Sequence, residues 1–238
     1  MTGPRLTSEP GTAVRDRLDP VLADRVTEAL LLTGLPVAHG GHGPGVHLLP
    51  DGDAVVLRWL ASPRLEDAAT AGGGPNPAAT ARQLVADAVE NALAELLPAL
   101  GLDAERTTVR GGAADRPAVA PGTPPAPDTP PVDPGVRADV VAAVRRSAAL
   151  AGLPVAARPG GAGITLGNAA GLADLDWNPS PRLPRQDGEL PNPRTAVQNA
   201  MRHALGIALR AGGLDLAWHR PPGRPAQLRA QGPSEHRS

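Results

Sequence analysis

Two arginines occur in the same short motif, and their side chains are candidates for binding an anion. Arg64 and Arg182 each stand in Trp-x-x-Ser-Pro-Arg-Leu, which the chain contains twice. Each lies between a predicted strand and a predicted helix that starts at Asn76 or Asn192. The N–H groups that open a helix attract anions, and a guanidinium can hold a phosphate or carboxylate with two hydrogen bonds. The motif predicts two anion- or partner-binding sites; the alternative is that each arginine pairs with an acidic side chain across its loop.

Three histidines surround a glycine-rich turn in the first half of the chain. His39, His42 and His47 could supply imidazole ligands to zinc. Alanine, glycine and threonine stand at the matching places 118 residues later, and the sequence shows no fourth ligand. We therefore expect exposed turn histidines and no bound metal.

Oxygen-bearing side chains alternate along one predicted strand, at Asp174, Asp176 and Asn178. They could bind a hard cation, but alternate strand residues lie about 6.6 Å apart, which is wide for one ion. A solvated outer face is the simpler interpretation. Ser62 and Ser180 precede proline, and the chain has no Gly-x-Ser-x-Gly turn that would expose a nucleophile. We expect neither a catalytic site nor a cofactor, so the protein is predicted not to be an enzyme.

Composition excludes several further classes of chemistry. All 23 basic residues are arginine, and cysteine, phenylalanine and tyrosine are absent, as is typical of a GC-rich bacterial genome. Without cysteine there is no disulfide or thiolate metal site, and without lysine there is no Walker-type phosphate loop or Schiff base. A net charge of −1 with scattered arginines predicts no nucleic-acid partner. The sequence contains no apolar run of about 20 residues and no signal-like start, so we expect a cytoplasmic protein with no membrane partner.

The chain resembles itself when it is shifted by 118 positions. Residues 19–65 then align with residues 137–183 without a gap, and 16 of the 47 pairs are identical. A shift of 116 aligns Pro-Asn-Pro at residues 75–77 with the same tripeptide at residues 191–193. Self-similarity of this extent predicts a tandem duplication of one structural unit.

Each unit is predicted to contain a helix, three short strands and a second helix. Leu22, Val26 and Leu30 recur at helical spacing, and Gly34 follows as a helix-ending residue. The third strand turns Trp59 and its counterpart Trp177 inward as core anchors. An edge strand after the second helix would complete an α-β-β-β-α(-β) unit of the α+β class, with an antiparallel sheet packed by helices on one face.

The predicted organisation has five parts. Residues 1–17 form a disordered N-terminus, residues 18–108 the first unit, residues 109–135 a proline-rich linker, residues 136–219 the second unit and residues 220–238 a disordered tail. An extended proline-rich linker is long enough to let the two units fold back on each other. We therefore expect an intramolecular pseudo-dimer.

The outer faces of the third strands differ between the units. Val56, Arg58 and Leu60 form this row in the first unit, whereas three polar residues form it in the second. An apolar patch on the first unit needs a cover, which is the other unit, a second chain or an external partner. We expect a non-catalytic protein–protein interaction or regulatory module with a protein partner or self-association; the alternative is a small-ligand or anion binder that uses the Ser-Pro-Arg-Leu loops.

Overall fold

The fold is described from a computed structural model of the 238-residue chain. The structure describes residues 18–38, 43–71, 75–110, 135–169, 172–183, 192–222 and 226–233.

The same sequence of elements occurs in both halves of the described chain, apart from one additional helix in the first. The first half consists of α1 (Pro20–Thr33), β1 (Gly45–Asp51), β2 (Ala54–Leu60), α2 (Pro63–Thr70), α3 (Pro77–Ala99), β3 (Asp103–Glu105) and β4 (Thr108–Arg110). The second half consists of α4 (Ala138–Ala151), β5 (Gly163–Ala169), β6 (Leu172–Asn178), α5 (Pro193–Ala211), β7 (Leu214–His219) and β8 (Gln227–Pro233).

The strands form two antiparallel sheets with corresponding order. One sheet has the order β1-β2-β4-β3 and the other β5-β6-β8-β7. Trp59 of β2 lies opposite Val46, and Trp177 of β6 lies opposite Ile164 at the corresponding register. Helices and antiparallel sheets are therefore combined in one chain, and the α+β class is confirmed.

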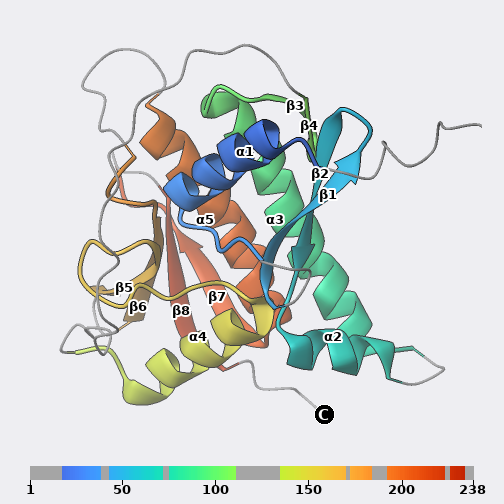
Figure 1. The fold of residues 1–238 in the computed structure, drawn as a ribbon. Coiled ribbons are helices and arrows are strands. Elements are labelled where there is room, and N and C mark those ends of the chain that lie inside the picture. The colour runs from blue at the N-terminus through green and yellow to red at the C-terminus, as the bar shows by residue number, and fades with distance from the viewer. Residues whose placement is uncertain are drawn as a thin grey trace, which may run out of the picture.

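The two longest helices, α3 and α5, lie side by side in the middle of the molecule, with one sheet on either side of them (Figure 1). α1 and α4 lie at opposite ends of this central pair. Buried apolar residues from both halves form one continuous core cluster. In the described part of the chain, no helix is long and apolar enough to cross a membrane.

The helix ends follow from local sequence. Asp19 caps α1 by accepting a 2.9 Å hydrogen bond from the Val21 N–H, and Pro20 takes the first helical position, where an N–H would have no partner within the helix. α1 and α4 end at Gly34 and Gly152, whose φ angles of 85° and 77° suit glycine. The end of α1 at Gly34 agrees with the sequence expectation.

The inward rows of β2 and β6 are buried as predicted. Leu57 is fully buried, and Trp59 and Trp177 are 3% and 0% exposed. The outer row of β2 is less open than predicted, because Val56 and Leu60 are half-buried.

The prediction of a first strand between α1 and β1 is wrong. The segment after α1 contributes one parallel bridge, in which Ala38 N–H donates to Val46 O and Val46 N–H donates to Pro36 O. Because Pro36 has no N–H to donate, this pairing does not extend into a strand. The second half repeats the arrangement with a bridge between Val155 and Ile164.

Other elements lie where none was predicted. β8 falls within residues 220–238, so the expected disordered tail is wrong for residues 227–233, where Leu228 and Ala230 are buried at alternating positions. β4 likewise extends to Arg110, inside the expected linker. Residues 1–17 and most of the predicted linker lie outside the described residues.

Candidate functional site at the seam between the halves

The repeated motif of the first half binds the end of a helix in the second half. The Trp59 indole donates from Nε1 to the Ala151 carbonyl at 3.0 Å. Three residues further on, the Ser62 backbone N–H donates to the Leu150 carbonyl at 3.1 Å. Both acceptors belong to the last turn of α4, where carbonyls have no partner within the helix. The motif thus supplies a C-terminal cap to a helix of the other half.

The second copy of the motif makes the same contacts in the opposite direction. Trp177 Nε1 donates to the Thr33 carbonyl at 2.7 Å, and the Ser180 N–H donates to the Leu32 carbonyl at 3.0 Å. All four residues lie 118 positions from their counterparts in the first set. Each half therefore caps the first helix of the other.

These bonds complete the last turn of each of the two helices. In α1 the Leu30 and Leu31 carbonyls accept from the N–H groups of Leu35 and Gly34, both at 3.2 Å, within the terminal turn. The remaining two carbonyls of the turn, those of Leu32 and Thr33, accept their hydrogen bonds from the second half. Because an unpaired buried carbonyl costs about 1–3 kcal/mol, the caps tie the stability of each half to the other.

The seam is closely packed at both helix ends. A Cβ atom at Gly152 would lie 2.8 Å from Pro44 Cβ, and one at Gly34 would lie 3.0 Å from Ala162 Cβ. The glycines therefore serve the backbone turn and the contact between halves together.

The candidate arginines lie at this seam, in different surroundings. Arg64 is exposed in the first turn of α2, because Ser62 caps that helix and Pro63 opens it. The motif begins a helix in the first half, where the sequence analysis expected a loop. Arg182 is exposed in a turn, and its N–H donates to Ser180 Oγ at 3.3 Å.

The asparagines act as the predicted helix caps. Asn76 Oδ1 accepts from the Ala78 and Ala79 N–H groups at 2.9 and 3.3 Å, and Asn192 Oδ1 accepts from the Arg194 N–H at 2.9 Å. These N–H groups, which the anion hypothesis would use, are already taken by side-chain oxygens.

Of the three candidate histidines the structure describes His47, and the expectation of an exposed turn residue is wrong there. His47 is buried, with Nε2 3.4 Å from the Gly43 carbonyl oxygen, while His39 and His42 lie outside the described residues. Over the described ranges, no group of three or more His, Asp or Glu side chains is placed to hold a metal.

The polar outer row of β6 is held by arginines. Asp174 pairs with Arg229 at 3.1 Å and Asp176 with Arg202 at 2.8 Å. A pocket of about 340 Å³ opens beside Asp174, Asp176 and Arg202, and its charges pair with one another. In the first half the charges are exchanged: the strand carries the cation, Arg58, which pairs with Glu90 of α3 at 3.3 Å.

An exposed ion pair opens α4. The hydrogen bond from Arg137 is the main cause that lowers the pKa of the Asp139 carboxyl below its ordinary value, and the same bond raises the pKa of Arg137. A lowered pKa stabilises the fold above the ordinary pKa of aspartate, and this contribution is lost as pH falls through the folded value. Solvent screening keeps the effect small.

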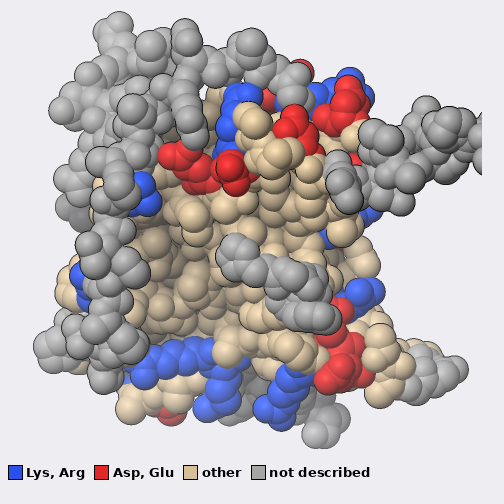
Figure 2. Space-filling view, viewed as in Figure 1, with Lys and Arg blue, Asp and Glu red and all other residues tan. Residues whose placement is uncertain are grey.

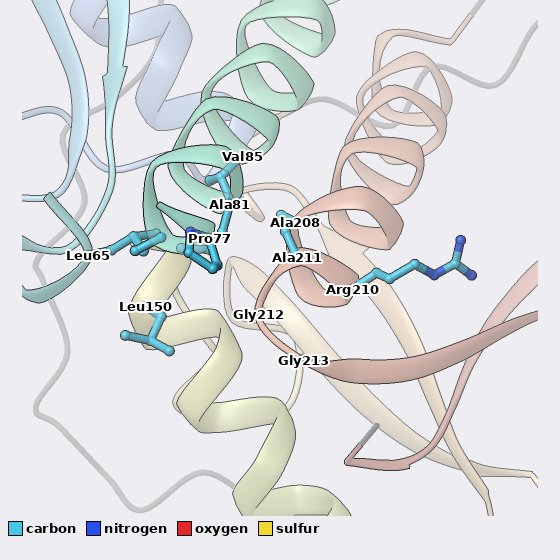
Figure 3. Close-up of a pocket in the computed structure, with 12 residues that line it drawn as sticks. Leu65, Pro77, Ala81, Val85, Leu150, Ala208, Arg210, Ala211, Gly212 and Gly213 are labelled. Carbon is cyan, nitrogen blue, oxygen red and sulfur yellow. The ribbon is translucent and has the colours of Figure 1, made fainter. Parts of the chain in front are cut away.

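An apolar pocket of about 410 Å³ lies between the halves (Figure 3). Leu65 of α2, with Ala81 and Val85 of α3, lines it from the first half. The ends of α4 and α5 line it from the second. Among the lining residues that the structure describes, Arg210 is the charged one; its side chain points away from the pocket and its Nη2 donates to the Leu216 carbonyl at 2.8 Å.

The matching place at the other end of the molecule is filled by larger side chains. Two residues are called matched when they occupy the same position in the two halves. Matched residues are 118 positions apart up to Leu65 and Leu183, and 116 positions apart in α3 and α5. Val197 matches Ala81 and Met201 matches Val85, and both larger residues are fully buried.

The end of α5 also leaves room at the pocket. Gly212 and Gly213 follow α5, whereas α3 continues through the matched Leu96 and Leu97, which are buried. A Cβ on Gly212 would lie 2.8 Å from Ser147 Cβ, so glycine also lets α4 approach α5. The small residues and the earlier end of α5 together leave the space of the pocket at one end of the molecule.

Comparison of the chain with protein-family models, with curated proteins and with solved structures found no match. The sequence analysis missed the pocket, because Ala81 and Gly212 carry no chemistry that marks them. Comparison of matched positions is the signal that would have pointed to it.

Proposed function

We propose that the chain is a tandem duplication folded as an intramolecular pseudo-dimer, and that it works as a non-catalytic protein-interaction module. The reciprocal caps support the pseudo-dimer, because a twofold interface makes every contact in both directions. Trp59 with Ala151, and Trp177 with Thr33, are such a pair of contacts.

The apolar pocket at the seam is the observation that carries the proposed binding function. Its lining offers methyl and methylene groups from both halves, and the Arg210 guanidinium is directed away from it. Such a pocket favours an apolar side chain of a partner, whose burial contributes about 1.5–3 kcal/mol for a residue such as leucine. Catalysis instead requires polar groups that converge on a reacting atom.

The predicted partner face on β2 has less support. Val56 and Leu60 are half-buried, and Arg58 donates to Glu90 of α3 at 3.3 Å. The pocket offers a deeper site for a partner than this row.

A blocked pocket tests the proposal. Peptides would be selected on the wild-type protein from a random display library, and their affinities measured by fluorescence anisotropy. Ala81→Phe places a large ring in the pocket and is expected to weaken binding by at least about tenfold. Gln83→Phe puts the same ring on an exposed position of α3 and serves as the control. Equal binding to both variants would refute the proposal.

The alternative function, anion binding by the Ser-Pro-Arg-Leu segments, draws on the exposed Arg64 and Arg182. It has less support because Asn76 and Asn192 already cap the nearby helices. Titration with inorganic phosphate by calorimetry, with Arg64→Gln and Arg182→Gln as variants, separates the two functions. Heat that both variants remove would favour the anion site.

A further inference from the structure

One sheet of the molecule ends in a strand that is long enough to pair with another strand. β7 has six residues and is the last strand in the order β5-β6-β8-β7, so within the described part of the chain one side of it has no strand neighbour (Figure 1). The other edge strands are less able to pair. β3 has three residues, β1 contains Pro50, and β1 and β5 each carry a parallel bridge, at Val46 and Ile164.

The backbone groups on the open side of β7 belong to Leu216 and Trp218. Alternate residues of a strand direct their N–H and C=O groups to the same side. The Leu216 carbonyl accepts a hydrogen bond at 2.8 Å from the side chain of Arg210, on α5, so the row that contains Leu216 and Trp218 faces away from β8. A carbonyl oxygen has two lone pairs, and this one can therefore accept a second hydrogen bond from a strand.

The side chains of β7 add an apolar surface to this edge. Trp218 is 43% exposed, and its ring lies against α5, where a Cβ on Gly206 would be 3.3 Å from Cζ2. Asp215 and His219 are exposed on the other face of the strand, with half-buried Ala217 between them. An open edge with an exposed aromatic side chain is a site where a further strand gains both hydrogen bonds and apolar contact.

We propose that β7 pairs with β7 of a second copy of this chain, antiparallel and centred on Ala217. A twofold axis then passes between the two Ala217 residues, and every contact occurs twice. Leu216 lies opposite Trp218 of the second copy and exchanges two backbone hydrogen bonds with it. The sheets that contain β7 in the two copies join into one continuous sheet.

The side chains of β7 complement themselves in this register. Asp215 faces His219 of the second copy, which sets an acid beside an imidazole, and Leu216 gives the exposed ring of Trp218 an apolar neighbour. The two Ala217 residues form a pair of the non-hydrogen-bonded type, in which the Cα atoms approach to about 4.5 Å, and small side chains suit this distance.

The edge of the other sheet lacks this complementarity. A β3 strand that paired with itself around Ala104 would set Asp103 against Glu105, which are both acidic. The shorter strand would also form fewer hydrogen bonds. Self-association is therefore expected at β7 and not at β3.

A different surface also has charges of both signs. Figure 2 shows acidic side chains gathered over α1 and arginines along the opposite border, over α4. These charges belong to two separate helices and fix no register. β7 combines a row of backbone groups with side chains that face their complements, which favours β7 as the interface.

A single cysteine tests the contact between the two Ala217 residues. The chain contains no cysteine, so one introduced thiol can form a disulfide only with a second copy. Full-length Ala217→Cys, oxidised with copper phenanthroline, is expected to form a covalent dimer at least about tenfold faster than Ala104→Cys, because side chains of a non-hydrogen-bonded pair are close enough to be bridged. Ala104 is the control because it is a half-buried alanine at the centre of the edge strand β3.

Sedimentation equilibrium of the full-length chain tests the register. One pair of short strands makes a small interface, so wild type should dimerise reversibly with a Kd on the order of 10–100 μM. His219→Asp sets two acids against each other at two places and should weaken the dimer about tenfold, and Asp215→Arg/His219→Asp should restore it. Asp103→Arg, an exposed position of β3, is the control and should leave the Kd unchanged.

Two results would overturn the proposal. One is a wild-type chain that remains a monomer up to about 1 mM. The other is a dimer that Ala217→Cys does not cross-link and that His219→Asp does not weaken, which would assign self-association to another surface, such as the one over α1 and α4.

Discussion

Each of the two buried tryptophans does two things at the seam. Its ring is buried in the core, and its indole N–H donates a hydrogen bond to a carbonyl at the end of a helix in the other half. A phenylalanine could do the first but not the second. The repeated Trp-x-x-Ser-Pro therefore combines a core anchor with a helix cap.

Trp59→Phe and Trp177→Phe should each lower the free energy of unfolding by about 1–3 kcal/mol, because each leaves a helix-end carbonyl without its donor. Urea unfolding followed by far-ultraviolet circular dichroism measures the loss. Trp218→Phe is the control, since this third tryptophan is 43% exposed and should cost little. A loss at Trp59 no larger than at Trp218 would show that the indole bond contributes nothing.

Gly152 is needed for its backbone angle and for its contact with the other half. Gly152→Ala meets both penalties, a φ of 77° and a Cβ 2.8 Å from Pro44. Gly101→Ala meets the angle alone, since φ is 76° there and a Cβ would meet no atom within 4 Å. Thermal unfolding should show Gly152→Ala to be less stable than Gly101→Ala by at least about 1 kcal/mol. Equal losses in the free energy of unfolding would mean that the contact with Pro44 tolerates an added Cβ atom.

At the scale of elements, Asn76 joins two helices. Its Oδ1 caps α3, while Nδ2 donates to the carbonyls of Ala68, Ala69 and Ala71 at the end of α2. The side chain thus fixes the corner at which Leu65 of α2 and Ala81 of α3 form one wall of the pocket.

Two substitutions separate these roles. Asn76→Ala should lose about 1–2 kcal/mol through the missing cap and should also loosen α2, whereas Asn76→Asp keeps the cap oxygen and loses the donor. Amide hydrogen exchange should therefore speed up in α2 for both variants, and in the first turn of α3 for Asn76→Ala only. Unchanged exchange in α2 would contradict the corner role.

The sequence predicted those elements whose signals are local. Helical spacing at Leu22 and Val26, the caps at Asn76 and Asn192, and the alternation around Trp59 each act within a few residues, and the structure contains all of them. β8 was missed because Leu228 and Ala230 stand in a segment rich in Pro, Gly, Arg and Gln, where packing against β6 outweighs intrinsic preference.

At the scale of the whole molecule, the contacts that join the halves had no local signal. Trp59 and its acceptor lie 92 residues apart, and Trp177 and its acceptor 144 apart. Each acceptor is a backbone carbonyl, which every residue possesses, so no residue type reveals the pairing. The repeat predicted that two similar units exist, but not that each would complete the other.

The candidate site follows the same division. Arg64 and the two asparagines stood out by residue type, and they lie at the starts of α2, α3 and α5. The pocket depends on small side chains and on the earlier end of α5, and these have meaning only once the matched positions are compared in space. The difference between the halves at matched positions is thus the feature that the proposed function uses.

The most direct test of this account separates the halves. Residues 1–122 and residues 123–238 would be produced as two chains and studied by sedimentation and circular dichroism, alone and mixed in equal amounts. Because each half caps the other, neither is expected to be a folded monomer, and the mixture should form a folded 1:1 complex that Trp59→Phe or Trp177→Phe weakens. A half that folds as a stable monomer and ignores its counterpart would contradict the account.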